Sequence, residues 1–355
     1  MKLVVLGLSL SSSWGNGHAT TFRALLKAFA ARGHDVLFLE RDVPWYADQR
    51  DLTDPDWCRL AFYRDLDDLH GWASDVAQAD AVIVGSYVPD GVEVGRWAQR
   101  TARGVTAFYD IDTPVTLAKL ARGDHEYLSP ELIPGYDVYL SFTGGPTLRH
   151  IEQHYGSPAA RALYCSVDPH GYRPTGAARR WDLSYLGTYS DDRQPTLTRL
   201  LIDAARAAPD RRFVVAGPQY PDTIDWPANV ERIDHLPPSE HAAFYSASRW
   251  TLNVTRADMI ARGWSPSVRL FEAAACATPI VSDRWDGLDR LLAPDREIVL
   301  ADTTADVLAA LDRTDAVAIG EAGRARVLAE HTAAHRAAEL EAHLLAATSA
   351  TRAAA

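Results

Sequence analysis

The chain has 355 residues, of which 47% are hydrophobic and 23% are charged, a length and composition typical of two packed globular domains. Its formal net charge of −11 argues against general nucleic-acid binding, because phosphate contacts need a concentrated basic surface, and we expect no nucleic-acid partner. Cys58, Cys165 and Cys276 lie far apart and form no Cys-x-x-Cys pair, so the sequence predicts neither a metal site nor a disulfide framework.

The first predicted element is a strand at residues 3–10. This apolar run is only as long as a strand, and Gly-Asn-Gly-His soon follows it, which favours a strand over a secretory signal peptide. No run of about 18 or more apolar residues occurs, so we expect no transmembrane helix. Three thiols without a secretory signal indicate a cytoplasmic protein, and the sequence leaves its oligomeric state open.

Short apolar strands alternate with longer helical patterns through residues 1–168. Strands that are apolar throughout, rather than alternating, are typical of a parallel sheet covered on both faces. The alternation therefore predicts a doubly wound, Rossmann-like N-terminal domain. Strands are expected at residues 3–10, 35–39, 81–84, 105–109 and 138–142, and helices at 18–31, 55–76, 91–103 and 146–154.

Residues 169–182 are the predicted linker, because they are rich in proline and glycine and show little periodicity. The alternation then restarts and predicts a second Rossmann-like domain at residues 183–330, followed by an Ala-rich helix at 331–355. The predicted fold class is α/β, with two facing domains built on parallel sheets and a ligand cleft between them. In the second half, strands are expected at residues 183–186, 213–216, 230–233, 250–254, 279–282 and 298–300, and helices at 195–207, 238–246, 267–276, 304–313 and from 316 onward.

The glycine-rich segment SSSWGNGHATT follows the first strand. Gly15 and Gly17 allow tight turns, and the helix that opens at His18 would direct its backbone N–H groups toward an anion or a sugar hydroxyl. A structural turn is an equal alternative. A nicotinamide-dependent oxidoreductase is another, because Gly15-x-Gly17 together with Glu40 at the end of the second strand matches part of a dinucleotide fingerprint, although Thr20 replaces its third glycine.

The segment YDIDTP places two carboxylates directly after a predicted strand. Asp110 and Asp112 can orient sugar hydroxyls, or one of them can act as a general base. The alternative is an Asp-rich turn, in which Asp112 or Thr113 caps a helix whose first turn contains Pro114.

The most informative segment is WSPSVRLFEAAACATPIVSDRWDGL. Ser265 and Ser267 supply hydroxyls and free amides at a helix start, where a diphosphate binds well. Arg269 and Glu272 are three residues apart and share one helix face, so Arg269 either faces phosphate or pairs with Glu272. A carboxylate at Glu272 can accept both ribose hydroxyls of a nucleotide.

The order of residues from Arg269 to Leu288, followed by Pro-x-x-Glu-Ile at residues 294–298, resembles the donor-binding domain of GT-B glycosyltransferases. The likeness is nearest to the spore-maturation CgeB-like group, which is related to retaining glycosyltransferase family 4. The resemblance implies that Glu272 binds the donor ribose. It further implies donor contacts to the diphosphate from Ser265, Ser267, Val268, Gly187 and Arg193, to the nucleobase from His235 and Leu236, and to the phosphate and sugar from Gly17 and His18. An equal alternative for Arg193 is to cap the following helix or to pair with Asp191 or Asp192.

The resemblance implies transfer of a sugar from a nucleotide diphosphate sugar, with UDP as the favoured nucleotide, to a hydroxyl of a small molecule or glycan. It implies that no metal or other cofactor is needed and that the anomeric configuration is retained. If the configuration is inverted instead, a protein base is required, and His18, Asp110 and Asp112 are the candidates. Many retaining relatives carry a first glutamate where this chain has Trp264, so a non-catalytic sugar-binding protein also stays open.

Overall fold

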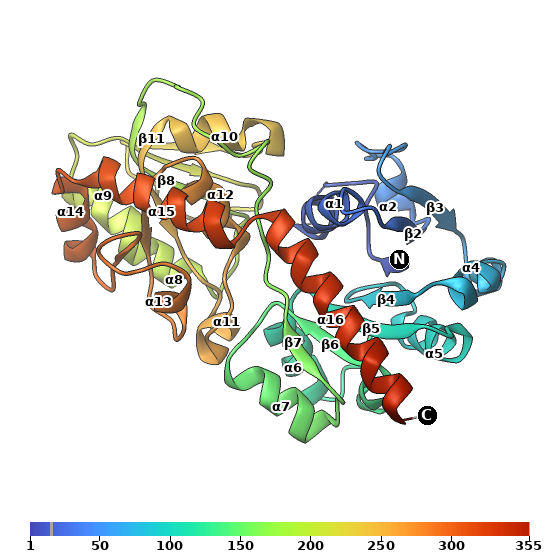
Figure 1. The fold of residues 1–355 in the computed structure, drawn as a ribbon. Coiled ribbons are helices and arrows are strands. Elements are labelled where there is room, and N and C mark those ends of the chain that lie inside the picture. The colour runs from blue at the N-terminus through green and yellow to red at the C-terminus, as the bar shows by residue number, and fades with distance from the viewer. Residues whose placement is uncertain (15–16, 355) are drawn as a thin grey trace. The chain divides into compact units, whose positions relative to one another are not determined.

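The computed structural model describes residues 1–14 and 17–354, with side chains as far as residue 350. Its contacts divide the chain into an N-terminal unit, Met1–Cys165 together with Ala333–Ala355, and a C-terminal unit, Ser166–Thr332 (Figure 1). Residues 169–182, the predicted linker, are grouped with the C-terminal unit.

The N-terminal unit is built on a seven-stranded sheet, counted over the described residues, in which all neighbouring strands pair in parallel. The strand order is β3-β2-β1-β4-β5-β6-β7, so the chain reverses its direction of travel across the sheet between β1 and β4. The strands are β1 (Lys2–Gly7), β2 (Asp35–Arg41), β3 (Arg59–Tyr63), β4 (Ala81–Gly85), β5 (Val105–Asp110), β6 (Val138–Ser141) and β7 (Ala160–Ala162).

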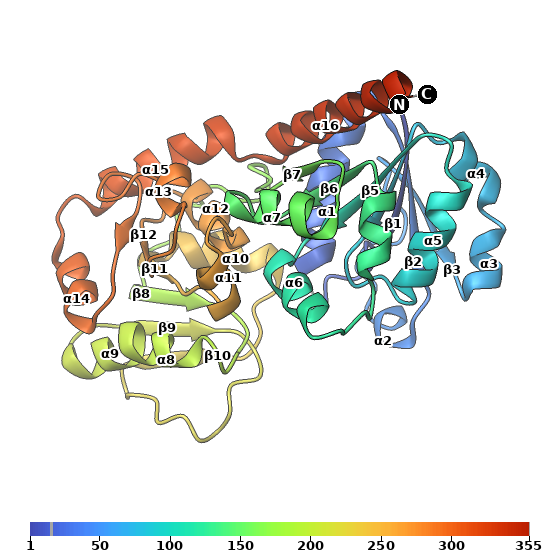
Figure 2. The same cartoon turned by 90° about the horizontal axis from the view of Figure 1, so that it is seen from below.

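Helices cover this sheet and bury its central strands. Every residue of β4 and β5 is buried, as expected for a parallel sheet packed on both faces. The helix α16 closes the unit, because it packs against α1 and beside β5 and β6 (Figure 2). The helical segments are α1 (Gly17–Ala30), α2 (Pro44–Ala47), α3 (Leu66–His70), α4 (Ala73–Gln78), α5 (Gly91–Thr101), α6 (Thr113–Ala121), η1 (Pro130–Gly135), α7 (Pro146–Tyr155) and α16 (Ala333–Ala354).

The prediction of one helix at residues 55–76 is wrong. Residues Arg59–Tyr63 form β3, an edge strand that pairs with β2, and two short helices follow it. The segment contains Phe62 and Tyr63, which favour strands, and the ladder with β2 supplies its hydrogen bonds. Helix α3 begins only after Asp65, whose carboxylate accepts a hydrogen bond from the backbone N–H of Asp68 at 2.8 Å.

The C-terminal unit repeats this topology. In the described residues its six parallel strands have the order β10-β9-β8-β11-β12-β13, with the reversal between β8 and β11. The strands are β8 (Trp181–Leu186), β9 (Phe213–Ala216), β10 (Val230–Ile233), β11 (Ser248–Asn253), β12 (Ile280–Ser282) and β13 (Val299–Leu300). The helical segments are α8 (Gln194–Leu197), η2 (Thr198–Ile202), α9 (Asp203–Ala207), α10 (Pro238–Ser246), α11 (Ala257–Arg262), α12 (Val268–Ala275), α13 (Leu288–Leu291), α14 (Thr304–Asp312) and α15 (Ala316–Glu330).

Each unit has its own apolar core, between its sheet and the covering helices. In the described part of the chain, every helix is too short or too polar to cross a membrane.

Candidate active site

Most of the predicted site residues lie where each sheet reverses its strand order. Ligands of doubly wound sheets bind outside the carboxyl ends of the strands at this point. In the C-terminal unit, Gly187 and Arg193 follow β8, and helix α12 begins after β11. In the N-terminal unit, His18 lies on α1 after β1, and Asp110 and Asp112 lie at and beyond the end of β5.

Ser267 starts α12 as the sequence predicts. Its backbone is extended, and its hydroxyl accepts a hydrogen bond from the backbone N–H of Arg269 at 3.3 Å, which caps the helix. Ser265 is buried, whereas Ser267 and Val268 are half-buried. The first backbone N–H groups of a helix have no partner within it, so the start of α12 suits an anion.

Arg269 lies along the carboxyl ends of β8 and β11. Its guanidinium donates to the Leu186 carbonyl, to Asn253 Oδ1 at 3.2 Å and to Ser267 Oγ at 3.3 Å. These bonds hold the guanidinium at the start of α12. Arg269 therefore does not pair with Glu272, the alternative that the i, i+3 spacing also allowed. Its guanidinium carbon is 5.2 Å from the centre of the Tyr185 ring.

Gly187 and Arg193 also follow β8 near Arg269, and Arg193 adds a second positive charge there. A side chain at Gly187 would approach Tyr185 Oη to 2.8 Å and Arg269 Nη2 to 2.9 Å, so only glycine fits there without a shift of its neighbours. Arg193 donates to the Thr188 carbonyl at 2.7 Å. The Tyr189 hydroxyl donates to Asp191 and the Ser190 hydroxyl to Asp192, so both carboxylates have hydrogen-bond donors other than Arg193.

Burial lowers the pKa of the Arg193 guanidinium, and the nearby charges of Arg269 and Arg256 lower it further. Positive groups that are partly dehydrated and repel one another gain stability when an anion binds between them. This part of the C-terminal unit can therefore hold a diphosphate.

Glu272 is 5% exposed and lies one turn along α12. His241 Nδ1 lies 4.0 Å from Glu272 Oε2, and His241 Nε2 lies 3.2 Å from the Leu236 carbonyl oxygen. Burial, followed by the charge of Glu272, raises the pKa of the Tyr172 and Tyr245 hydroxyls, and the Tyr172 hydroxyl lies 3.3 Å from His241 Nδ1. His241 thus connects Glu272 to the loop after β10, where His235 is exposed and Leu236 half-buried.

The Trp264 indole packs against Gly287. Its backbone is left-handed, with φ of 50°, and its N–H donates to the Asp286 carbonyl at 2.5 Å. A side chain at Gly287 would collide with the indole, so the glycine makes room for the ring. Sugar stacking on the remaining face of Trp264 stays a prediction.

In the N-terminal unit, Gly17 is exposed at the start of α1, and Gly15 lies outside the described residues. The Nδ1 atom of His18 is buried and has no hydrogen-bond partner in the part of the chain that is described. The His18 ring meets the Tyr87 ring edge-on, with centroids 5.3 Å apart. Burial lowers the pKa of His18 to about 4, so the ring is neutral at pH 7 and is a weak base.

Asp110 and Asp112 have different environments. Asp110 is fully buried, and its carboxylate accepts hydrogen bonds from Tyr139 Oη at 2.5 Å, Thr116 Oγ1 at 2.7 Å and the Asp112 N–H at 3.2 Å. Asp112 is half-buried at the N-cap of α6, but its side chain does not cap the helix; Oδ2 accepts from Tyr87 Oη at 3.1 Å. This environment favours a structural role for Asp110, and Asp112 is the better placed of the two for contact with a ligand.

Glu40 holds the loop at residues 9–11 by hydrogen bonds, so a bound dinucleotide is not needed to account for this buried carboxylate. The fully buried carboxylate accepts hydrogen bonds from the N–H groups of Leu10 (2.6 Å) and Ser11 (2.9 Å) and from the hydroxyls of Ser9 (3.2 Å) and Ser11 (2.7 Å). A carboxylate with four donors from its own chain is poorly available to a ribose. The structure therefore disfavours the nicotinamide alternative.

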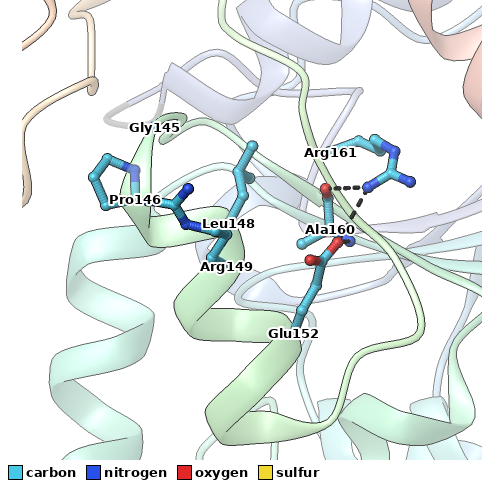
Figure 3. A pocket seen from close by; sticks show the side chains of 7 residues that line it. All are labelled: Gly145, Pro146, Leu148, Arg149, Glu152, Ala160 and Arg161. Atoms are coloured by element: carbon cyan, nitrogen blue, oxygen red, sulfur yellow. Dashed lines mark hydrogen bonds and ion pairs between the residues drawn. The ribbon is translucent and has the colours of Figure 1, made fainter.

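A separate open hollow of about 440 Å³ lies between the start of α7 and β7 (Figure 3). There Glu152 accepts hydrogen bonds from the Ala160 N–H at 2.9 Å and from Arg161 at 3.1 Å, so its charge is already balanced. None of the predicted site residues lines this hollow, and we assign no role to it. It is lined by Gly145, Pro146, Leu148, Arg149, Glu152, Ala160 and Arg161.

Residues that sequence reasoning missed are Tyr87, Tyr172 and His241. Tyr172 lies in the segment predicted as a linker, and His241 lies inside a helix that the sequence did predict. No spacing marks any of the three, because only the tertiary structure brings them to Asp112 and Glu272.

Comparison with known proteins agrees with this geometry. A family model described as glycosyl transferase-like matches residues 193–342, which include Arg193, Arg269 and Glu272. No curated protein matches the chain by sequence.

Solved structures match over nearly the whole chain. Sucrose-phosphate synthase from Thermosynechococcus elongatus has a TM-score of 0.70 at 16% identity, over 98% of this chain and 100% of that one. HepE from Anabaena, in complex with UDP-glucose, has a TM-score of 0.69 at 13% identity, over 98% and 100%. An α-glucosyltransferase in complex with UDP and DNA has a TM-score of 0.69 at 13% identity, over 97% and 99%.

These likenesses confirm the predicted fold class: the chain has the α/β GT-B fold of two units with parallel sheets. A cleft between the units stays a prediction.

Proposed function

We propose that the protein is a glycosyltransferase of the CgeB-like group, related to family 4, that transfers a hexose from a nucleotide diphosphate sugar to an acceptor hydroxyl. The observation that carries the proposal is the arrangement around α12. Arg193 and Arg269 lie beside the helix start at Ser267, and the buried Glu272 lies one turn further on. A diphosphate with an attached ribose matches this order of charges.

UDP is the nucleotide we propose, because UDP-glucose and UDP are bound in structurally similar proteins. Glu272 would accept the ribose hydroxyls, and backbone groups at His235 and Leu236 would contact the base. The arginines would stabilise the charge that grows on the departing diphosphate, which makes the proposed reaction independent of metal.

The N-terminal unit would bind the acceptor, a small molecule or a glycan. Asp112 would accept a hydrogen bond from the acceptor hydroxyl, and Gly17 and the neutral His18 would donate to the donor phosphate or sugar. The bond from the anomeric carbon to the diphosphate breaks as the bond to the acceptor oxygen forms. With retention, which the family resemblance supports, the acceptor proton passes to a diphosphate oxygen; with inversion, Asp112 would take it.

Two measurements test this function. Calorimetry with UDP, GDP, dTDP and NAD should show UDP binding at micromolar concentrations and no saturable NAD binding. Incubation with radiolabelled UDP-glucose and a panel of sugars, phenols and hydroxylated aglycones should yield a labelled product, whose anomeric configuration is read by NMR. Preference for NAD over every nucleotide diphosphate would overturn the proposal.

A non-catalytic nucleotide-sugar-binding protein is the second candidate, because Trp264 replaces the acid expected near the donor sugar. It predicts UDP-glucose binding without release of UDP under any acceptor condition.

A further inference from the structure

Tyr87 joins the two N-terminal residues to which we assign contacts with the reactants. Its hydroxyl donates to Asp112 Oδ2 at 3.1 Å, and its ring packs edge-on against His18 with centroids 5.3 Å apart. His18 comes from α1, Tyr87 follows β4 and Asp112 follows β5, so three segments meet at the point where the sheet reverses its strand order.

The backbone of Tyr87 is in the left-handed region, with φ of 63°. An aromatic residue there is a conformational outlier that persists only where its surroundings hold it. Its neighbour Ser86 supplies such a restraint: the Ser86 N–H donates to the Tyr109 carbonyl at 2.9 Å, and Ser86 Oγ accepts from the Ile111 N–H at 3.1 Å. The strained turn directs the Tyr87 side chain to His18 and Asp112.

Tyr127 also packs against the Tyr87 ring. The centroids of the Tyr87 and Tyr127 rings lie 4.5 Å apart. Tyr127 Oη lies 2.8 Å from Thr116 Oγ1, which in turn donates to Asp110. The titratable groups around Tyr87 are therefore His18, Asp112, Tyr127 and the buried Asp110.

We propose that Tyr87 is a positioning residue for transfer: its hydroxyl holds the Asp112 carboxylate toward the acceptor hydroxyl, and its ring shields the His18 imidazole from water. The inference rests on the proposed transferase function, but it assigns a role to a residue outside the donor-binding segment. Its action runs through Asp112, so the two residues must be coupled.

A double-mutant cycle with radiolabelled UDP-glucose and the acceptor found in the panel tests this coupling. Tyr87→Phe should lower kcat about 10-fold and leave the KM for UDP-glucose within about twofold, because the residues proposed to bind the nucleotide diphosphate belong to the C-terminal unit. Asp112→Asn should lower kcat more, and adding Tyr87→Phe to it should lower kcat no further. The control is Tyr63→Phe, which removes a buried hydroxyl without a hydrogen-bond partner among the described residues. Additive losses, or an unchanged kcat in Tyr87→Phe, would overturn the proposal.

An NMR titration of His18 separates this proposal from the proposed function. The ring of Tyr87 contributes to the burial that lowers the pKa of His18 to about 4, so in Tyr87→Ala that pKa should rise toward 6.5. In Tyr87→Phe, which keeps the ring, it should stay low. If the wild type transfers no sugar, the proposed transferase function is wrong, but the titration still tests whether Tyr87 shields the His18 imidazole. An unchanged titration in folded Tyr87→Ala would show that Tyr87 does not shield the imidazole.

Discussion

The two units share one strand order, and each buries a glutamate near the carboxyl ends of its strands, but the two carboxylates are held in different ways. Glu40 accepts four hydrogen bonds from the loop at residues 9–11, whereas Glu272 lies beside His241 and two tyrosine hydroxyls on a helix whose first turn carries Arg269. The same architecture thus uses one buried acid to build a loop, and we propose that it offers the other to a ligand. Burial alone does not reveal function; the partners of the carboxylate do.

The charges around the strand ends differ in the same sense. The C-terminal unit gathers Arg193 and Arg269, which suit a diphosphate, and Arg256 lies nearby, paired with Asp192 at 3.5 Å. The N-terminal unit gathers Tyr87, Asp112 and a neutral His18, which suit an uncharged hydroxyl. The difference supports the proposal that the C-terminal unit binds the nucleotide diphosphate and the N-terminal unit binds the acceptor.

The largest expected effect is on folding, from Glu40→Ala. The change leaves the buried N–H groups of Leu10 and Ser11 without their acceptor, so the free energy of unfolding should fall by about 3–5 kcal/mol and Tm by roughly 10 °C. Thermal unfolding followed by circular dichroism measures this, with the exposed Glu93→Ala as control. An unchanged Tm together with lost NAD binding would instead make Glu40 a ligand-binding residue.

Asp110→Asn should change how stability depends on pH. Burial raises the pKa of Asp110 from 3.8 to about 6, so the folded chain keeps a proton that the unfolded chain releases. Stability contributed by this group is present below pH 3.8 and is lost as pH rises through about 6. The stability of Asp110→Asn relative to wild type should therefore increase by on the order of 3 kcal/mol between pH 4 and pH 7. Urea unfolding at several pH values measures it, and the exposed Asp48→Asn should show no such trend.

Apolar patterning predicted most of the strands and several helices. For example, β9, β10 and α10 have the bounds expected from the sequence. It failed at β3 and β7, because an edge strand owes its conformation to the ladder with its neighbour, here β2 or β6, rather than to a clear period of its own. Site prediction followed the same division. Ser267 and Glu272 belong to a local pattern of helix start and spacing, whereas Tyr87 and His241 owe their positions to contacts with segments distant in the chain.

Glu272→Ala tests the ligand-binding side of the comparison between the two glutamates. Loss of an acceptor for the ribose hydroxyls should weaken UDP binding about 100-fold, which corresponds to about 2.7 kcal/mol. Calorimetry measures the Kd, and the exposed Glu321→Ala on α15 is the matched control. If Glu272→Ala lowers Tm as Glu40→Ala does and leaves the UDP affinity of the folded protein unchanged, the two glutamates have the same structural role.

Arg193→Ala should have the smallest effect and tests the charge difference between the units directly. Its guanidinium is bonded to the Thr188 carbonyl and does not cap α8 by its side chain, so removing it should cost little stability. UDP binding should weaken about 10-fold, or about 1.4 kcal/mol, while binding of uridine, which has no phosphate, should not change. Added salt should weaken UDP binding to wild type more steeply than to Arg193→Ala, because ions screen the attraction that the variant has lost. The exposed Arg212→Ala, elsewhere on the same unit, controls for net charge. An equal loss for uridine and UDP would mean that Arg193 shapes the nucleoside site, and the diphosphate would then depend on Arg269 and the start of α12 alone.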